Sequence, residues 1–374
     1  MRGSTRARRT GITLVNVVVL VLIFFSAAWF VLPTINTARG PTRQNTCRSN
    51  LSNLALAMIQ YEVRQGHYPG YMNVLERTDK CVYVDPDTGR PTPVSWVVEL
   101  LPDLDRVQLY DQWQEIPGSA VNAAPTASSS SAAQPYNVKI YLEILTCPSA
   151  EHLKRAGTPL SYVVNSGMPD LVSAVPAVDG ASPPQLGVPR DWAANGLFFD
   201  NYSDDPRIKP SAAARGPMIL MRSDMIRDSK DRTVLLTENF DAGSYVVDLK
   251  ADLARNPERT ELDWGCIWEA GPIRDENGKL VMSPGERASA PNANRRLANQ
   301  GPSYKLCRPS SSHPGGFNVA FAGKNVQFVR DTISYFIYAK LMASDDQNAR
   351  LPGSPEKLDP LFSRDSVRDE DLNP

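Results

Sequence analysis

The sequence predicts an α+β fold in which a long N-terminal helix, transmembrane at its start, packs on a largely antiparallel β-sheet. Three observations predict it: an uncharged apolar stretch near the N-terminus, a helix-periodic stretch after it, and several short apolar runs separated by turn residues. The 374-residue chain has 31 prolines and 23 glycines, which indicates a loop-rich body rather than a helical bundle. At this length, one large domain with loops and a tail is as plausible as two domains.

The apolar stretch covers residues 12–32 and contains no Asp, Glu, Lys or Arg. At about 1.5 Å per residue, it is long enough to span a bilayer core of roughly 30 Å as a transmembrane helix. Arg8 and Arg9 precede it, so the positive-inside rule predicts a single-pass inner-membrane protein with a cytoplasmic N-terminus and a periplasmic or cell-surface body. A cleaved secretory signal is the alternative, because residues 26–28 are small, but apolar residues continue after them.

A helical extension is predicted over residues 33–66. Its second part, residues 43–65, is expected to be amphipathic and to pack one face on the body, because its apolar side chains are three or four residues apart at Leu51, Leu54, Met58 and Tyr61. Gly40-Pro41 predicts a kink or break, since proline lacks a backbone donor and clashes with the preceding turn. Gly66 is expected to end the helix.

The extracytoplasmic body is predicted over residues 67–345, with its sheet built from short apolar runs at 138–147, 216–222, 232–239 and 244–249. Alternating apolar residues from Phe317 to Phe328, with a turn between them, predict a hairpin in which Gly323 supplies a positive φ. Residues 331–343 are predicted to form a helix or strand against the core.

Two segments are predicted to lie outside the packed body. Residues 115–137 fall in a low-complexity Ala/Ser/Pro stretch that cannot bury enough surface to fold, so we expect a flexible insertion. Residues 346–374 are charged and proline-bearing, so we expect a disordered tail.

The stretch RRTGITLVN, residues 8–16, resembles the type IV prepilin processing site, in which a basic leader ending in Gly is cut before an apolar helix. The resemblance implies a leader over residues 1–11, cleavage between Gly11 and Ile12 by a prepilin peptidase, and a kinking proline at Pro33.

Asn16 occupies the position at which pilins have a Glu that is thought to neutralise the amino group of a neighbouring subunit in the filament. A carboxylate in an apolar layer needs a charged partner, and Asn cannot take its place. Asn16 is therefore expected to weaken recruitment into a filament, as in a tip pseudopilin of a type II secretion system. The alternative is that Asn16 is a tolerated polar residue near the membrane surface.

Six further segments, in order along the chain, resemble a planctomycete family of prepilin-type proteins with a C-terminal domain of unknown function, whose signature is His, nine residues, Asp-Gly. They are CRSNLSNLALAMIQY (47–61), SWVVELLPDLDRVQLYDQW (95–113), LTCPSA (145–150), NGLFFD (195–200), IRDSKDRTVLLTE (226–238) and SSHPGGFNVAFAGKNVQFV (311–329). The resemblance implies an enlarged pilin-like body.

The signature residues in this chain are His313, Pro314, Gly315, Gly316 and Gly323. The sequence departs from the family pattern because Gly323-Lys324 replaces Asp-Gly, and because Ser229 and Asp231 replace the Gly and Ser of the internal motif. The hairpin is expected to be kept and a carboxylate to be lost.

No metal site, cofactor or catalytic centre is predicted. The chain has three histidines, and the close pair Cys147 and His152 has no second pair to complete a metal site. His313 is expected to cap the turn into the hairpin through a hydrogen bond to backbone, although a ligand or base role remains the alternative. No hydrolase, metalloprotease or phosphate-loop motif is present, so we expect a protein that is not an enzyme.

The five cysteines would face an oxidising compartment if the topology is as predicted, and at most two disulfides can form within the chain. They are Cys47, Cys81, Cys147, Cys266 and Cys307. Cys266 and Cys307 flank a long polar segment, so we expect this pair to form a disulfide. The alternative is that all five are buried thiols.

Together these features predict a non-enzymatic, membrane-anchored pilin-like or pseudopilin-like subunit, a minor or tip component of a type IV pilus or type II secretion-like filament. Its expected partners are the inner membrane, a prepilin peptidase and other pilin-like subunits. Nucleic acid is not expected, because the net charge is -1 and no dense Lys/Arg block follows the first nine residues. The alternative is a membrane-tethered module that binds carbohydrate or a surface partner.

Two features would discriminate these functions. A solvent-facing apolar stripe on residues 34–62 would favour assembly. A pocket lined by tryptophan would favour a binding module; the candidates are Trp96, Trp113, Trp192, Trp264 and Trp268.

Overall fold

The fold is taken from a computed structural model. It describes residues 14–76, 91, 93–114, 140–150, 157–169, 191–202, 205, 218–240, 242–246, 263–268, 273–274, 280–281, 307–352, 355, 357–358, 362 and 366–372. For residues 27–41, 273–274 and 280–281 it describes the backbone only. The predicted insertion at 115–137 lies outside the described residues.

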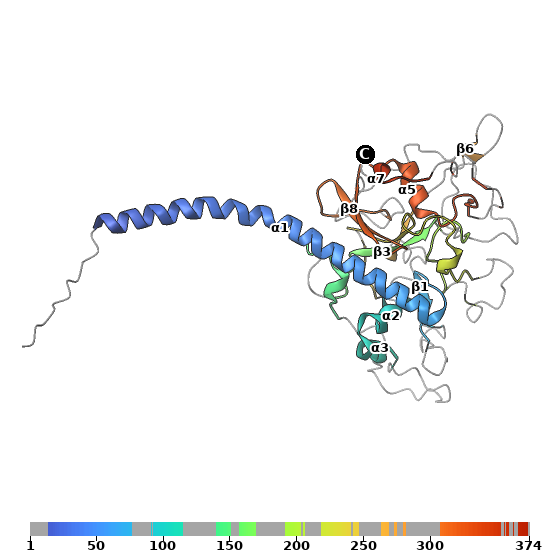
Figure 1. Cartoon of the computed structure of the whole chain (residues 1–374). Coiled ribbons are helices and arrows are strands. Elements are labelled where there is room, and N and C mark those ends of the chain that lie inside the picture. Colours follow the sequence, from blue (N-terminus) through green and yellow to red (C-terminus); the bar gives the residue numbers. More distant parts are fainter. Residues whose placement is uncertain are drawn as a thin grey trace, which may run out of the picture.

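One long helix, α1, runs from Leu14 to Gln65, and its first half projects from the body (Figure 1). Of the kink or break predicted at Gly40-Pro41, the break is wrong, because α1 is continuous through both residues, and the helix bends along its length. A proline in a helix removes a single N–H and leaves the hydrogen bonds of the neighbouring turns in place, so a long helix can bend rather than end. Gly66 ends α1 in the left-handed conformation, with φ 81°, as predicted.

The second half of α1 is amphipathic, as its spacing predicted. Leu51, Leu54 and Met58 are 0% exposed, and Tyr61 is 5% exposed. These residues face the body, while Leu56 and Val63 on the other side of the helix are exposed. The packed half of α1 is therefore fixed by burial of one apolar face.

A five-stranded sheet forms the centre of the body, in the order β5-β3-β4-β8-β9. Only the β3–β5 pair is parallel, so the predicted α+β fold with a largely antiparallel sheet is confirmed. Its strands are β3 (Tyr162–Gly167), β4 (Val234–Glu238), β5 (Gly265–Ile267), β8 (Gly316–Phe321) and β9 (Val326–Arg330).

The central strands β3, β4 and β8 are buried along their whole length, so both faces of the sheet are covered. On one face, the Tyr162 hydroxyl accepts a hydrogen bond of 3.3 Å from Asn50 of α1. On the other face, Asn165 donates to the carbonyl of Met342 at 2.7 Å. Met342 ends α5 (Tyr335–Met342), so α1 and α5 pack on opposite faces (Figure 1).

The predicted hairpin 317–328, the strand within 232–239 and a helix within 331–343 are present as β8–β9, β4 and α5. The other predicted strands are wrong in their described parts. Residues 140–147 form a short 3-10 helix and a turn, and residues 218–222 and 244–246 form no strand. Strand β3 was not predicted, because its sequence YVVNSG ends in residues with low strand propensity.

Shorter elements surround this core. They are β1 (Met72–Val74), β2 (Pro93–Ser95), α2 (Trp96–Leu100), η1 (Pro102–Leu104), α3 (Val107–Gln114), η3 (Glu143–Leu145), η5 (Ser223–Met225), β6 (Ile273–Arg274), β7 (Leu280–Val281) and α7 (Asp369–Leu372). β1 pairs antiparallel with β2, and β6 with β7.

The described residues of the C-terminal segment 346–374 contradict the predicted disordered tail. Phe362 is 1% exposed and stacks on Trp268, with 5.4 Å between ring centroids. Leu372 in α7 is also 1% exposed. These two apolar residues are far apart in a polar segment, so the composition of the segment indicated disorder. Composition does not show that the body provides a surface on which they can pack.

Among the residues that the structure describes, no helix combines the length and the hydropathy needed to cross a membrane. Residues 12–13 of the predicted transmembrane helix, and the side chains of residues 27–32, lie outside the described part of the chain. The transmembrane helix stays a prediction.

Candidate functional site

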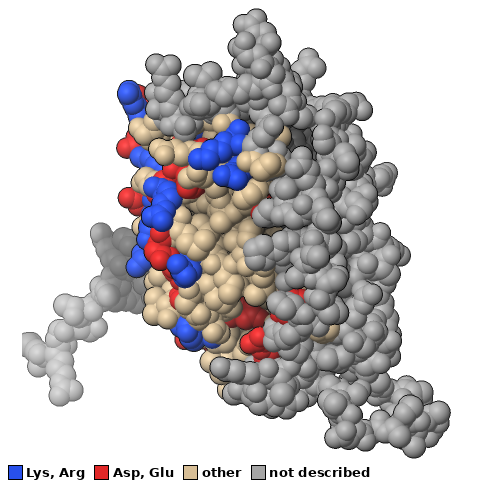
Figure 2. All heavy atoms as spheres, turned by 90° about the vertical axis from the view of Figure 1, so that its right-hand side faces the viewer, with Lys and Arg blue, Asp and Glu red and all other residues tan. Residues whose placement is uncertain are grey.

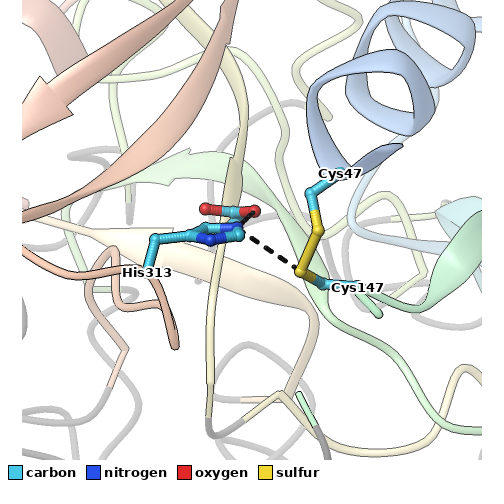
Figure 3. Close-up of side chains that lie close together, drawn as sticks. Cys47, Cys147 and His313 are labelled. Atoms are coloured by element: carbon cyan, nitrogen blue, oxygen red, sulfur yellow. Dashed lines mark hydrogen bonds and ion pairs between the residues drawn. A yellow bond between two sulfur atoms is a disulfide. The ribbon is translucent and has the colours of Figure 1, made fainter. Parts of the chain in front are cut away.

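Four chemically reactive side chains from four separate parts of the chain meet between α1 and the sheet (Figure 3). Cys47 comes from the buried face of α1, Cys147 from the turn after η3, Glu238 from the end of β4, and His313 from the loop before β8. All four are buried, with exposures of 0 to 6%. This group, hereafter the Cys-His-Glu cluster, was not predicted from the sequence.

Cys47 and Cys147 form a disulfide with a Cα–Cα distance of 5.1 Å, which links residues 100 positions apart. The predicted pair Cys266 and Cys307 is wrong, because both are buried thiols. Sequence spacing does not fix connectivity. Here the pairing follows from the docking of α1, which places Cys47 over the turn that contains Cys147. Cys81 lies outside the described residues.

Three nitrogen atoms contact the two side-chain oxygens of Glu238. The backbone N–H of Asn318 donates to Oε2 at 2.8 Å, and the Asn318 side-chain amide donates to Oε1 at 3.1 Å. The His313 Nε2 lies 3.2 Å from the same Oε1. Because buried carboxylates are tolerated only when such donors surround them, this network fixes the orientation of Glu238.

His313 points its ring into the cluster. Its Nε2 is 3.6 Å from the Cys147 sulfur as well as 3.2 Å from Glu238 (Figure 3). The predicted role of its side chain in capping the turn through a hydrogen bond to backbone is therefore wrong. Instead, the Ser311 hydroxyl makes the local turn bonds, because it accepts from the His313 N–H at 3.0 Å and donates to the Gly316 carbonyl at 2.6 Å.

The signature residues around His313 shape this loop. Pro314 is exposed. Gly315 has φ 77°, which favours glycine. A side chain at Gly316 would overlap the Val329 carbonyl of the neighbouring strand. The two glycines therefore let the chain turn tightly into β8 while His313 remains directed at the disulfide.

Tyr162 and Asn50 border the cluster on the α1 side. Asn50 donates through its amide to the Thr146 carbonyl and to the Tyr162 hydroxyl, each at 3.3 Å. Burial, and then the nearby Glu238 carboxylate, raise the pKa of Tyr162 well above its usual range, so the phenol stays neutral. Neutral polar groups thus line the cluster on its α1 side.

The cluster has the composition of a metal site. The two sulfurs, one imidazole nitrogen of His313 and one carboxylate oxygen of Glu238 all lie within 4.8 Å of one another. Sulfurs joined in a disulfide are not thiolates and do not bind zinc as such. His152, the sequence-based candidate beside Cys147, lies outside the described residues. The fold brings these ligand types together between α1 and the sheet, although they are far apart in the sequence.

The turn at Gly323 differs from its predicted role. Lys324, not Gly323, has the positive φ, at 74°. A Cβ at Gly323 would overlap the carboxylate of Asp231. The family signature has an Asp where this chain has Gly323. Here the Asp231 carboxylate occupies the space that a side chain at residue 323 would fill, so a residue without a side chain is needed there.

The predicted assembly residues, Asn16 and Pro33, precede Cys47 in α1 and are not part of the Cys-His-Glu cluster. Asn16 is exposed in the first turns of α1. Pro33 lies in the part of α1 whose side chains are not described. The leader arginines Arg8 and Arg9, and the bond between Gly11 and Ile12, are outside the described residues.

Charged side chains on the face shown in Figure 2 are mixed in sign. Lys and Arg lie beside Asp and Glu along one edge, next to an uncharged surface. On this face the described residues form no extended patch of one sign, in keeping with the net charge of -1.

The family comparison covers most of the chain. The model of a family described as "Protein of unknown function (DUF1559)" matches residues 36–334, so the chain belongs to this family. The match includes all four residues of the Cys-His-Glu cluster and ends before the tail. Comparisons with curated proteins and with solved structures give no match.

Proposed function

We propose that this member of the DUF1559 family is a non-enzymatic, membrane-anchored, pilin-like subunit that projects an apolar helix from a folded extracytoplasmic body. One observation carries the proposal. Every apolar residue of α1 from Leu14 to Phe25 is between 46% and 80% exposed, on all sides of the helix.

A helix with apolar side chains all round needs apolar surroundings on every side. The packed half of α1 has only one such face, and the sheet covers it. The first half has no cover from the described body, although its residues would favour burial in lipid or among other helices. A bilayer before assembly, and a bundle of like helices after it, would both supply that environment.

Asn16 is the polar residue within this apolar segment. Its amide can form a hydrogen bond to a neighbouring helix, but it brings no negative charge for the amino group of a neighbouring subunit. We therefore assign the chain to a minor or tip position, where such a neighbour is missing, rather than to the repeating part of a filament.

The Cys-His-Glu cluster supports a structural rather than a catalytic role for the body. Glu238 and His313 are 2% and 5% exposed, so their reactive atoms do not face a substrate in solution. The alternative of a tryptophan-lined binding site finds little support, because Trp96, Trp113, Trp264 and Trp268 are at most 2% exposed. Trp192 is partly buried, and Arg350 stacks on its ring at 4.5 Å.

The first test determines the N-terminus of the protein purified from its own membranes, by intact mass and terminal sequencing. A chain that begins at Ile12 supports processing by a prepilin peptidase, and Gly11→Leu is expected to block it. A wild-type chain that begins at Met1 contradicts the pilin-like proposal and leaves a plain membrane-anchored module.

The second test addresses assembly through Asn16. Asn16→Glu restores the negative charge and is expected to raise the fraction of the protein in sheared filaments. Asn16→Gln keeps the amide and serves as the matched control, with no expected increase. An unchanged fraction with Asn16→Glu contradicts the assigned reason for a minor or tip position.

A further inference from the structure

We propose that the chain with its Cys47–Cys147 disulfide reduced binds one Zn²⁺, with Cys47, Cys147, His313 and Glu238 as the four ligands. The inference is independent of the proposed pilin-like function. It rests on the positions and the chemistry of these four side chains.

The spacing of the cluster is already close to that of a zinc site. Zn–S bonds of about 2.3 Å and Zn–N or Zn–O bonds of about 2.0–2.2 Å in a tetrahedron place ligand atoms roughly 3.3–3.8 Å apart. The His313 Nε2 lies 3.6 Å from the Cys147 sulfur and 3.2 Å from the Glu238 Oε1. Once the S–S bond is broken, the main change needed is a separation of the two sulfurs.

The ligand types select the metal. Two thiolates with an imidazole and a carboxylate suit Zn²⁺, whereas Ca²⁺ and Mg²⁺ prefer oxygen ligands. All four residues are at most 6% exposed, so four protein ligands would close the site to water. Closed four-ligand sites are structural, and this one would hold α1 to the sheet at the point where the disulfide does so.

The surroundings of the cluster prepare Glu238 and His313 for this role. Asn318 donates its backbone N–H to the Glu238 Oε2 and its side-chain amide to Oε1, and this orients Oε1 3.2 Å from the His313 Nε2. Metal-binding carboxylates commonly have such a supporting hydrogen bond. For binding, neutral His313 carries its proton on Nδ1, so that the Nε2 lone pair faces the metal.

Charge also favours the exchange. The disulfide of the oxidised chain is neutral. In the zinc form, the two positive charges of the ion offset the two negative charges of the thiolates. Replacing the disulfide by the ion and two thiolates therefore adds no net charge to the buried site, which avoids the desolvation cost of an additional buried charge.

The chemical steps balance. A water-soluble phosphine gives two electrons to the disulfide and becomes a phosphine oxide with oxygen from water, while two protons from water complete the two thiols. Zn²⁺ then replaces those thiol protons. In the reverse direction, a small-molecule disulfide accepts two electrons from the thiolates and two protons from water. It becomes two thiols, Cys47 and Cys147 re-form their disulfide, and the ion leaves.

The test uses the full-length chain in detergent and Co²⁺ as the probe. After reduction with the phosphine and its removal without oxygen, Co²⁺ is expected to bind with one-to-one stoichiometry. It should show the thiolate-to-cobalt absorption and the intense visible bands of tetrahedral cobalt. Zn²⁺ should bleach these bands, and reoxidation with a small-molecule disulfide should release the ion. The oxidised chain is the control with the same sequence, and it should give no such bands.

Variants identify the ligands. His313→Ala and Cys147→Ser are each expected to weaken Co²⁺ binding by at least about tenfold, and Cys147→Ser should also lower the thiolate absorption. Cys266→Ser removes a buried thiol outside the cluster and is the matched control, with unchanged spectrum. If the reduced chain loses its folded circular dichroism spectrum, Zn²⁺ is expected to restore it, because metal binding is then coupled to folding.

Three results would overturn the proposal. The first is a folded, reduced chain without the tetrahedral bands. The second is their persistence at full strength in Cys47→Ser/Cys147→Ser, which would assign the metal to other thiols. The third is an unfolded, reduced chain that Zn²⁺ fails to refold.

Discussion

The two halves of α1 belong to one continuous helix and meet opposite environments. Leu20 in the first half is 63% exposed, whereas Leu54 in the second half is 0% exposed. The second half is stabilised by the sheet beneath it, and the Cys47–Cys147 disulfide lies at its start. Helix geometry is thus shared along α1, but the stabilising contacts of the described body are confined to one half.

The largest expected difference comes from the same substitution in each half. Leu54→Ala removes a fully buried side chain and should lower the free energy of unfolding of the body by about 2–5 kcal/mol. Leu20→Ala should change it by less than about 0.5 kcal/mol. Denaturant titrations in detergent, followed by tryptophan fluorescence, measure both values. Equal effects would show that the projecting half also packs on the body.

A change of pH should also affect the packed half of α1 and not the projecting half, and the expected effect on stability is smaller than that of Leu54→Ala. Burial, and then the nearby Glu76, raise the pKa of Glu99 to about 7, and the Tyr61 hydroxyl of α1 lies 3.4 Å from its Oε2. The folded chain therefore keeps this proton when the unfolded chain has lost it. Stability should fall as pH rises from about 4.5 to about 7, by on the order of 3 kcal/mol, and then remain level.

Glu99→Gln cannot titrate and should reduce the pH dependence of stability in that window, as measured by denaturation at about pH 5 and about pH 8. The part that remains is expected from Asp228, because burial and then the nearby Asp346 raise its pKa to about 6. The segment 12–32 contains no titratable side chain, so membrane association through it should not change over the same range. An equal pH dependence in wild type and Glu99→Gln would assign the effect to another group.

The smallest expected effect lies in the β8–β9 hairpin, against which the packed half of α1 rests. Lys324 has φ 74°, so Lys324→Gly should relieve strain and stabilise the body by up to about 1 kcal/mol. Gly323→Ala should destabilise it, because the new Cβ would overlap Asp231. Thermal unfolding of both variants measures the signs. A loss of stability in Lys324→Gly would mean that the lysine side chain contributes more than the backbone strain costs.

Local pattern was sufficient for the packed half of α1 and for the hairpin. Leu51, Leu54 and Met58 repeat at helical spacing, and alternation marks β8 and β9, so each element could be predicted from its own residues. Strand β3 could not, because YVVNSG owes its strand conformation to pairing with β4 on one side and β5 on the other.

The Cys-His-Glu cluster could not be predicted from the sequence for a related reason. Its members are at positions 47, 147, 238 and 313, and no spacing along the sequence relates them. They come together only when α1 docks on the sheet and the η3 turn reaches it. His313 was singled out by its neighbouring glycines, but the identity of its partners depended on tertiary packing. The cysteine pair was predicted wrongly for the same reason, because spacing along the sequence does not show which cysteines meet in the fold.

The position of the disulfide has a mechanical consequence. Tension applied to the projecting half of α1 reaches Cys47 and can pass through a covalent bond to Cys147, directly into the body. The buried residues from Leu51 to Tyr61 then bear little of that load, and the helix cannot be peeled from the sheet one turn at a time. Under traction, the packed half of α1 can be peeled from the sheet only after this one bond ruptures or is reduced.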